Sequence, residues 1–209
     1  MQHRKKPAQQ SRKKVKGLSQ VATGAIRIIS GQWRGRKLPV LNAEGLRPTT
    51  DRTKETLFNW LMQDIRGLSC LDAFSGSGSL GFEALSRGAT SLAFLEMNAQ
   101  AAKQLKSNID LLKVPQGQAT VMQQDTLAYL NQKADRAYDL VFVDPPFGKG
   151  LVAPVLSRLV ENGWLADDGL VYLEMEQPAP CIIEPCWDVL KSKETSQFSY
   201  RLMQLRGDV

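Results

Sequence analysis

The stretch Leu71-Asp-Ala-Phe-Ser-Gly-Ser-Gly-Ser-Leu-Gly81 carries three glycines in the pattern G-x-G-x-x-G, at Gly76, Gly78 and Gly81. The pattern follows an apolar segment and precedes one with helical spacing, so it predicts a loop between a strand and a helix. Glycine in such a loop permits a tight turn and lets a ligand approach the backbone closely. The stretch therefore predicts an α/β fold with a ligand-binding crevice at the end of this strand.

The rest of the chain alternates between apolar runs and helical patterns. Five strands are predicted over residues 69–74, 91–96, 119–123, 138–144 and 169–175. The run Leu140-Val-Phe-Val143 suits a strand covered on both faces, which favours a mostly parallel, doubly wound sheet. Two final segments, over 187–190 and 198–205, have no long helix between them. They predict an antiparallel pair at one edge, for seven strands in all.

The 209 residues carry a net charge of +6 that is unevenly distributed. Residues 1–66 hold 15 basic and 4 acidic side chains, whereas residues 67–209 hold 12 and 17. We expect three parts: a flexible basic tail over 1–20, a small extension over 21–66 and the α/β domain over 67–209. A basic front end joined to a mildly acidic body is typical of proteins that bind nucleic acid.

The predicted extension combines a hairpin with a helix. Two short strands, over 25–29 and 36–40, flank a turn-prone segment. A helix is predicted from Asp51 to near Gly67, with Thr49 or Thr50 as its N-cap. The nearby Trp33 could stack on a base or cap the core of the hairpin, and we expect the second.

Composition excludes several kinds of protein. The only histidine is His3, so catalytic Ser-His-Asp or Cys-His sets and histidine-rich zinc sites are not expected, and we predict no metal. The three cysteines, an odd number without C-x-x-C spacing, argue against a disulfide framework. No apolar run approaches the roughly 18 residues of a membrane span. The N-terminus has no apolar signal segment, and it is Lys-rich rather than Arg-rich, unlike a transit peptide. We expect a cytoplasmic protein.

Three carboxylates lie at or just beyond the carboxyl ends of the predicted strands. Glu96 lies 20 residues after Gly76, where an acid can hold ribose hydroxyls, so a dinucleotide site is one interpretation. Asp72 favours another, because a carboxylate repels a pyrophosphate but attracts the ammonium and sulfonium groups of S-adenosylmethionine. Asp125 could accept from an adenine amino group or serve as a helix N-cap. The glycine loop alone could also be only a tight turn with a packing glycine.

The most specific motif is Asp144-Pro-Pro-Phe147, directly after a very apolar strand. The prolines fix the backbone and remove two donors, which leaves the Asp144 carboxylate and the Pro145 carbonyl as paired acceptors. A planar amino group can donate to both, and Phe147 offers a ring on which a base can stack. The alternative is a rigid turn with a buried Phe. The motif predicts a site for an amino group of a nucleobase.

These motifs together resemble the class I S-adenosylmethionine-dependent N-methyltransferases. The segments 29–38, 46–57 and 76–88 narrow the resemblance to the bacterial RsmD-type family, over about Ile26 to Leu205. That family methylates N2 of guanine 966 in 16S ribosomal RNA of the small subunit. The resemblance implies a Rossmann-like fold, S-adenosylmethionine as cofactor, and the small subunit or its assembly intermediate as partner. We expect a monomer, because a base must reach an open crevice.

The resemblance also implies the site residues. The catalytic residues would be Asp144, Pro145, Pro146 and Phe147. The cofactor-binding residues would be Asp72, Phe74, Gly76, Gly78, Glu96 and Asp125. Phosphate contacts would come from the basic residues of the extension, namely Arg27, Arg34, Arg36, Lys37, Arg47, Arg52 and Lys54. These cations could instead be a solvated basic face, with Arg52 and Lys54 as ordinary helix surface charges.

Three other functions remain possible from the sequence. A DNA adenine-N6 or protein glutamine methyltransferase would use the same Pro-Pro motif, although such DNA enzymes usually carry a larger recognition domain. A nicotinamide-dependent dehydrogenase would use the glycine loop but leave Asp72 and Asp144 unexplained. A non-catalytic RNA-binding module would use the basic extension but not Asp144.

Overall fold

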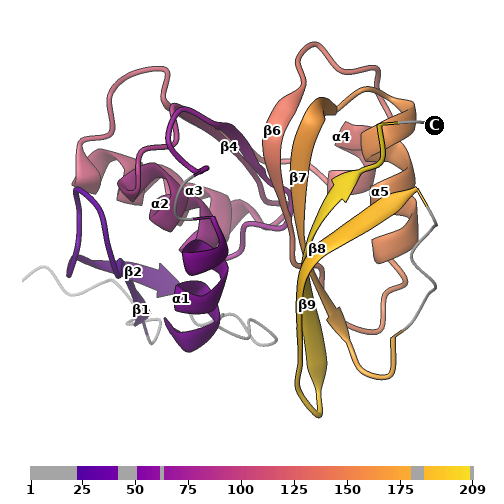
Figure 1. Ribbon diagram of the computed structural model, residues 1–209. Coiled ribbons are helices and arrows are strands. Elements are labelled where there is room, and N and C mark those ends of the chain that lie inside the picture. Colours follow the sequence, from indigo (N-terminus) through magenta and orange to yellow (C-terminus); the bar gives the residue numbers. More distant parts are fainter. Residues whose placement is uncertain (1–22, 42–50, 62–63, 180–185, 208–209) are drawn as a thin grey trace, which may run out of the picture.

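The computed structural model describes residues 23–41, 51–61, 64–179 and 186–207 (Figure 1). The predicted tail over 1–20, Arg47 and the two candidate N-caps at Thr49 and Thr50 lie outside these residues. The strands of the main sheet are β3 (Ser69–Asp72), β4 (Ser91–Leu95), β5 (Ala119–Met122), β6 (Tyr138–Val143), β7 (Leu165–Glu176), β8 (Trp187–Glu194) and β9 (Phe198–Leu205).

Seven strands form one sheet in the order β5-β4-β3-β6-β7-β9-β8. The first five strands run parallel to one another, and β9 is antiparallel to both β7 and β8. The predicted seven-stranded, mostly parallel sheet with an antiparallel edge is therefore confirmed. Because β3 lies between β4 and β6, the chain winds in opposite directions from β3, and ligands bind at the carboxyl ends of strands where this happens.

Helices cover both faces of the sheet (Figure 1). One face packs against α1 (Asp51–Trp60), α2 (Ser79–Ser86) and α3 (Ala99–Leu112), and the other against α4 (Thr126–Leu130) and α5 (Val152–Glu161). Leu140 and Phe142 of β6 enter the first core, while Val141 and Val143 enter the second, and all four are fully buried. This explains the continuous apolar run, since alternate side chains of a strand point to opposite faces.

The element boundaries differ from the predictions by a few residues at several ends, and the end of the first helix and the start of β7 differ for reasons that the contacts explain. The helix predicted to end near Gly67 ends at Trp60, and the chain then turns through Asp64, whose N–H donates to the Leu61 carbonyl at 3.0 Å. The strand predicted from 169 begins at Leu165, because a register shift between Tyr138 and Leu140 lets β7 pair with β6 on both sides of it. Neither change moves the carboxyl end of β6 or β7.

The N-terminal hairpin packs against the main domain. It consists of β1 (Thr23–Arg27) and β2 (Lys37–Leu41), which pair antiparallel. Buried Ile26, Ile28 and Leu38 belong to the same core as α1, α2 and one face of the sheet. Trp33 packs against this core too, as predicted.

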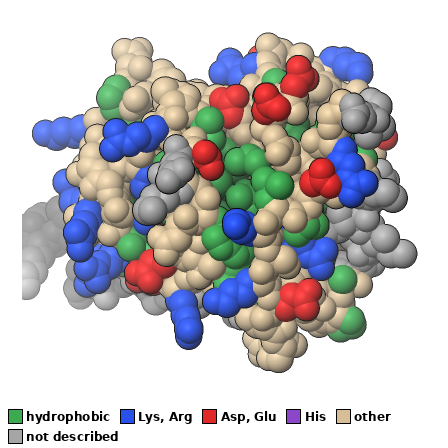
Figure 2. Space-filling model, viewed as in Figure 1, with side chains coloured by type: hydrophobic (Ala, Val, Ile, Leu, Met, Phe, Trp, Pro, Cys, Tyr) green, Lys and Arg blue, Asp and Glu red, His purple; other side chains and the backbone are tan. Residues whose placement is uncertain are grey.

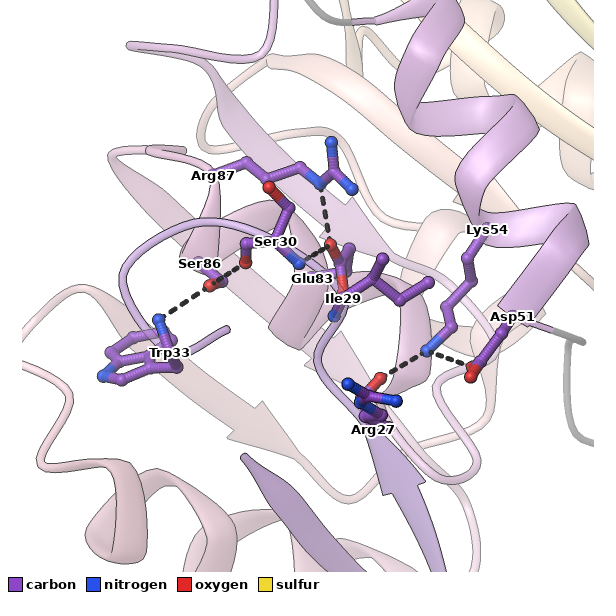
Figure 3. Close-up of polar contacts among 9 residues, drawn as sticks. All are labelled: Arg27, Ile29, Ser30, Trp33, Asp51, Lys54, Glu83, Ser86 and Arg87. Atoms are coloured by element: carbon purple, nitrogen blue, oxygen red, sulfur yellow. Dashed lines mark hydrogen bonds and ion pairs between the residues drawn. The ribbon is translucent and has the colours of Figure 1, made fainter. Parts of the chain in front are cut away.

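Glu83 of α2 fastens the hairpin to the main domain (Figure 3). Its side chain is fully buried and accepts hydrogen bonds from the backbone N–H groups of Ile29 at 2.8 Å and Ser30 at 3.0 Å. It also pairs with Arg87 Nε at 2.7 Å. Next to it, the Ser86 hydroxyl donates to the Ser30 carbonyl at 2.6 Å. The Glu83 carboxylate, which lies in an otherwise apolar helix, thus has hydrogen-bond and ion-pair partners. The same contacts join the hairpin rigidly to α2, the helix that begins at the glycine loop.

Replacing Glu83 with alanine should lower the free energy of unfolding by about 3 kcal/mol, because it leaves two buried N–H groups and the Arg87 guanidinium without their acceptor. Urea unfolding followed by circular dichroism measures the change. The matched control is Glu55→Ala on the exposed side of α1. Equal stability of the two variants would show that the Glu83 contacts do not hold the hairpin.

Candidate active site

A cavity of about 580 Å³ opens at the carboxyl ends of β3, β4 and β6. Nine of the ten predicted catalytic and cofactor-binding residues line it, namely Asp72, Phe74, Gly76, Glu96, Asp125, Asp144, Pro145, Pro146 and Phe147. The fold thus brings together segments that lie up to about 75 residues apart in the chain. The exception among the ten is Gly78, which does not line the cavity.

The glycine loop adopts a backbone that other residues rarely tolerate. Gly78 has a φ of +76° and precedes α2, and a Cβ there would come within 2.6 Å of a Leu105 methyl group. Gly81 lies inside α2, where a Cβ would come within 2.4 Å of the Phe94 ring. These two glycines therefore let the loop turn and let α2 pack closely on β4, while Gly76 faces the cavity.

Asp72 is the buried acid of the cavity, with 3 % of its surface exposed. Burial, together with the nearby charge of Glu96, raises the pKa of its carboxyl to about 7, although hydrogen bonds from the backbone N–H groups of Gly81 and Phe74 lower it. The bond from Gly81, to Oδ2, is 3.2 Å long. A buried carboxylate with a raised pKa is stabilised by a bound cation, so this end of the cavity suits a positively charged group.

Glu96 and Asp125 are oriented by backbone N–H groups. Glu96 accepts from Gly76 at 2.8 Å through Oε2 and from Asn98 at 2.7 Å through Oε1. Each carboxylate oxygen has a second lone pair with which it can accept from a ligand hydroxyl. Asp125 caps α4 by accepting from the Ala128 N–H at 2.8 Å, so the N-cap interpretation is correct, and it also lines the cavity.

The Asp144-Pro-Pro-Phe147 segment forms the opposite wall. Pro145 is buried, whereas Phe147 is 37 % exposed at the mouth of the cavity. The loop is anchored from β7, because the Gly148 N–H donates to Glu176 Oε2 at 2.7 Å. The exposed apolar ring of Phe147 and the Asp144 carboxyl line the same cavity and together suit a flat ligand with an amino group.

The sequence interpretation missed several lining residues. The side of the Asp144 motif also contains Glu174 of β7, Phe198 of β9 and Leu151, and the α1 helix contributes Thr53. Glu174 and Phe198 lie on β7 and β9, which are brought near β6 by the order of the strands in the sheet. No local sequence pattern therefore predicts that these two residues line the cavity. Met97, which follows Glu96, lines the cavity at the cofactor side and is 72 % exposed.

Most of the predicted phosphate-binding residues lie on the surface. Arg27, Arg34, Arg36, Lys37 and Arg52 are all exposed. Lys and Arg side chains are spread over the face in Figure 2, and several of them lie on its left side, where Figure 1 shows the hairpin. Arg36 also donates from Nη2 to the Leu111 carbonyl at 3.1 Å, which ties the hairpin to the end of α3.

Lys54 requires a correction. Its side chain is 2 % exposed, and Nζ donates to the Arg27 carbonyl at 2.7 Å and pairs with Asp51 at 3.4 Å (Figure 3). The helix places Lys54 on the same face as Leu57 and Phe58, so the ammonium enters the core side and bonds the hairpin backbone. Lys54 joins α1 to β1 and does not present its charge to a nucleic acid.

Within the described ranges, no group of three or more His, Cys, Asp or Glu side chains could hold a metal ion. No helix in the part of the chain that the structure describes is long and apolar enough to cross a membrane. Cys70 is buried and Cys186 half-buried, and both are thiols.

A mostly parallel sheet with β9 inserted antiparallel, a glycine loop after β3 and an Asp-Pro-Pro-Phe segment after β6 define a Rossmann-like methyltransferase. Comparison with solved structures supports this class. The structure of a putative methyltransferase from Escherichia coli matches with a TM-score of 0.80 and 46% sequence identity, covering 88% of this chain and 100% of that one.

The sequence comparisons identify the family. The profile of the family described as Conserved hypothetical protein 95 matches residues 26–204. Ribosomal RNA small subunit methyltransferase D of Haemophilus influenzae is 53% identical over 88% of this chain and 95% of its own length. The protein of the same name from Escherichia coli is 48% identical over 87% of this chain and 91% of its own length. The chain belongs to this family, the ribosomal RNA small subunit methyltransferase D (RsmD) family. The dehydrogenase and the non-catalytic RNA-binding module are thereby set aside.

Proposed function

We propose that the chain transfers a methyl group from S-adenosylmethionine to the N2 amino group of a guanine in 16S ribosomal RNA of the small subunit. The observation that carries the proposal is that Asp144 and Pro145 share one cavity with Asp72 and Glu96. Acceptors for an amino group therefore face a pocket for a cationic methyl donor. The names of the relatives support ribosomal RNA as the substrate class.

The cavity residues fit S-adenosylmethionine. The volume of about 580 Å³ lies within the range of roughly 300–1,000 Å³ that holds small ligands. Buried Asp72 suits the ammonium or sulfonium group, and the amino end of α2 suits the carboxylate. The Ser79 hydroxyl beside the cavity is buried and makes no hydrogen bond within the described residues, so it can bond a ligand. Glu96 would accept from the ribose hydroxyls and Asp125 from the adenine amino group.

When bound, S-adenosylmethionine would supply a methyl group on a sulfonium sulfur, which guanine N2 would accept while the sulfur keeps the electron pair of the broken bond. The lone pair of N2 is delocalised into the base, which makes it a poor nucleophile. Hydrogen bonds from the amino group to Asp144 and to the Pro145 carbonyl turn it out of the ring plane and aim its lone pair. Catalysis by these residues is therefore mainly positioning, with Asp144 also available to accept the released proton.

The remaining residues hold the RNA. Phe147 at the mouth of the cavity would stack on the target base, which must be unstacked to enter. The exposed cations of the hairpin and α1 would contact phosphates, and the rigid joint at Glu83 would fix their distance from the cavity. We place this activity in the cytoplasm on a monomeric enzyme, with 16S ribosomal RNA, the small subunit or an assembly intermediate as partner.

The alternative is another nucleic-acid amino-methyltransferase, such as one acting on adenine N6 of DNA. The test incubates the purified chain with radiolabelled S-adenosylmethionine and, separately, small subunits from cells lacking the modification, their protein-free 16S RNA, and duplex DNA. We expect label in one or both RNA substrates and none in DNA. Label in DNA alone would reject the proposed substrate class.

Arg34→Gln and Lys37→Gln should each weaken RNA binding and reduce the slope of log affinity against log salt by about one, because each removes a phosphate contact. Filter binding between about 50 and 200 mM salt measures both quantities. Lys133→Gln is the matched control, because Lys133 is exposed and bonds the carbonyl of Glu161 in α5, which covers the face of the sheet opposite α1 and the hairpin. The same loss in all three variants would mean that the hairpin has no special role.

A further inference from the structure

Glu174 of β7 is a buried carboxylate in the cavity that the proposed mechanism does not use. Only 6 % of its surface is exposed, and it lines the cavity together with Asp144. In the parallel pairing of β6 and β7, Phe142 lies opposite Tyr172 and Val143 opposite Leu173. The same register continued brings Asp144 beside Glu174, on the face that also carries Phe142 and Tyr172. Asp144, directly after β6, and Glu174, near the carboxyl end of β7, therefore bring two carboxyl groups side by side.

Tyr172 fixes the orientation of Glu174. The Tyr172 hydroxyl donates to Glu174 Oε1 at 2.6 Å, and its ring is fully buried against Phe142, with 6.4 Å between the ring centroids. Burial raises the pKa of Tyr172 well above its usual value, and the charges of Glu174 and Asp144 raise it further. The hydroxyl consequently stays protonated as a donor, and both acidic groups lie close to it.

An amino group alone does not identify guanine, because adenine and cytosine also carry one. The atom beside the amino group does distinguish them: guanine has the donor N1–H, whereas adenine has the acceptor N1 and cytosine the acceptor N3. A carboxylate accepts only, so it attracts an N1–H and repels a ring nitrogen lone pair. A pair of neighbouring carboxylates matches the two adjacent donors of guanine and of no other common base with an amino group.

Resting on the proposed function, we propose that Glu174 is the residue that selects guanine, by accepting a hydrogen bond from N1–H while Asp144 accepts from the N2 amino group. Tyr172 is a positioning residue that holds the Glu174 carboxylate toward the base. Pro145, Asp144 and Glu174 then read the donor edge of the base together, and the N1 proton stays in place during methyl transfer.

The test compares guanine with 2-aminopurine at the target position of a synthetic RNA that the enzyme methylates. 2-Aminopurine keeps the N2 amino group but presents a lone pair at N1. The wild-type enzyme should prefer guanine by about 100-fold or more in kcat/KM, since a site built for a donor rejects an analogue that lacks it. Glu174→Gln should narrow that preference by about tenfold or more, because the glutamine amide can donate to N1 of 2-aminopurine.

Two further variants make the result decisive. Glu161→Gln, at the far end of α5, should leave the guanine preference at the wild-type value. Tyr172→Phe, which removes one hydroxyl, should narrow the preference in the same direction as Glu174→Gln and serves as the test if the latter does not fold. Binding of S-adenosylmethionine by calorimetry reports folding of each variant.

The two proposals fail in different ways. A preference that stays unchanged in folded Glu174→Gln, or in Tyr172→Phe, would overturn the role of Glu174 alone. A wild-type enzyme that transfers no methyl group to guanine N2 in any RNA would overturn the proposed function itself.

Discussion

Replacing Asp144 with alanine should reduce kcat for RNA methylation by about 1,000-fold or more while leaving the affinity for S-adenosylmethionine within about threefold of the wild-type value. The expected loss is large because the reaction depends on aiming a weak nucleophile, and well-oriented groups contribute several powers of ten to rate. We expect the variant to keep its affinity for S-adenosylmethionine because Asp144 lies apart from the cofactor residues. Asp144 follows β6, whereas Asp72 is the last residue of β3 and Glu96 follows β4. Single-turnover methylation and calorimetry measure the two quantities.

The matched control is Asp167→Ala, at an exposed position near the start of β7 and away from the cavity. It should keep full activity. Substantial methylation by Asp144→Ala under saturating RNA and cofactor would contradict the assignment of Asp144 as a catalytic residue.

Replacing Asp72 with asparagine should have two opposite effects. The affinity for S-adenosylmethionine should fall by about 100-fold, because the variant loses a negative charge in a desolvated site next to a cationic ligand. The ligand-free protein should become more stable at pH 8, by about 3 kcal/mol, because the variant no longer buries an ionised carboxylate. The asparagine carbonyl can still accept from the Gly81 N–H, so the loop keeps that bond.

The gain in stability of the ligand-free variant should depend on pH, because it arises from the ionisation of Asp72. Folding raises the pKa of Asp72 from 3.8 to about 7, so the folded protein holds the proton more tightly than the unfolded chain. The carboxyl therefore costs no stability below about pH 4, and the cost grows to its full value as the pH rises through about 7. The wild type should match the variant near pH 4 and be less stable at pH 8, as measured by urea unfolding. A variant that is less stable than the wild type at pH 8 would contradict the burial of an ionisable Asp72.

The sequence was most informative where a local pattern decides the structure. Apolar runs identified the five parallel strands, because burial on both faces leaves a continuous signal such as Leu140–Val143. The mostly exposed strand β8 was predicted together with β9, because no long helix lies between their segments. The glycine loop and the Asp144 motif each sit at the carboxyl end of a strand, so their meeting in one cavity follows from the α/β class. Nine predicted residues accordingly line the same cavity.

The missed features depend on contacts between distant segments. Glu174 becomes a site residue only because β7 lies beside β6, and strand order is not written in any single segment. Glu83 looks like a surface acid until the hairpin covers it, although its place in the apolar helix Ser79–Ser86 already requires partners. Lys54 carried a usable signal, since it shares a helical face with Leu57 and Phe58. The prediction that Lys54 is exposed used its charge alone and neglected this helical face.

The identity of the methylated nucleoside tests the central claim most directly. Small subunits from cells lacking the family's methyltransferase would be incubated with the purified chain and S-adenosylmethionine, and the 16S RNA digested to nucleosides for mass spectrometry. The proposal predicts that N2-methylguanosine rises toward one equivalent per subunit with the wild type and stays at background with Asp144→Ala. Methylation that appears only as another nucleoside, such as N6-methyladenosine, would contradict it.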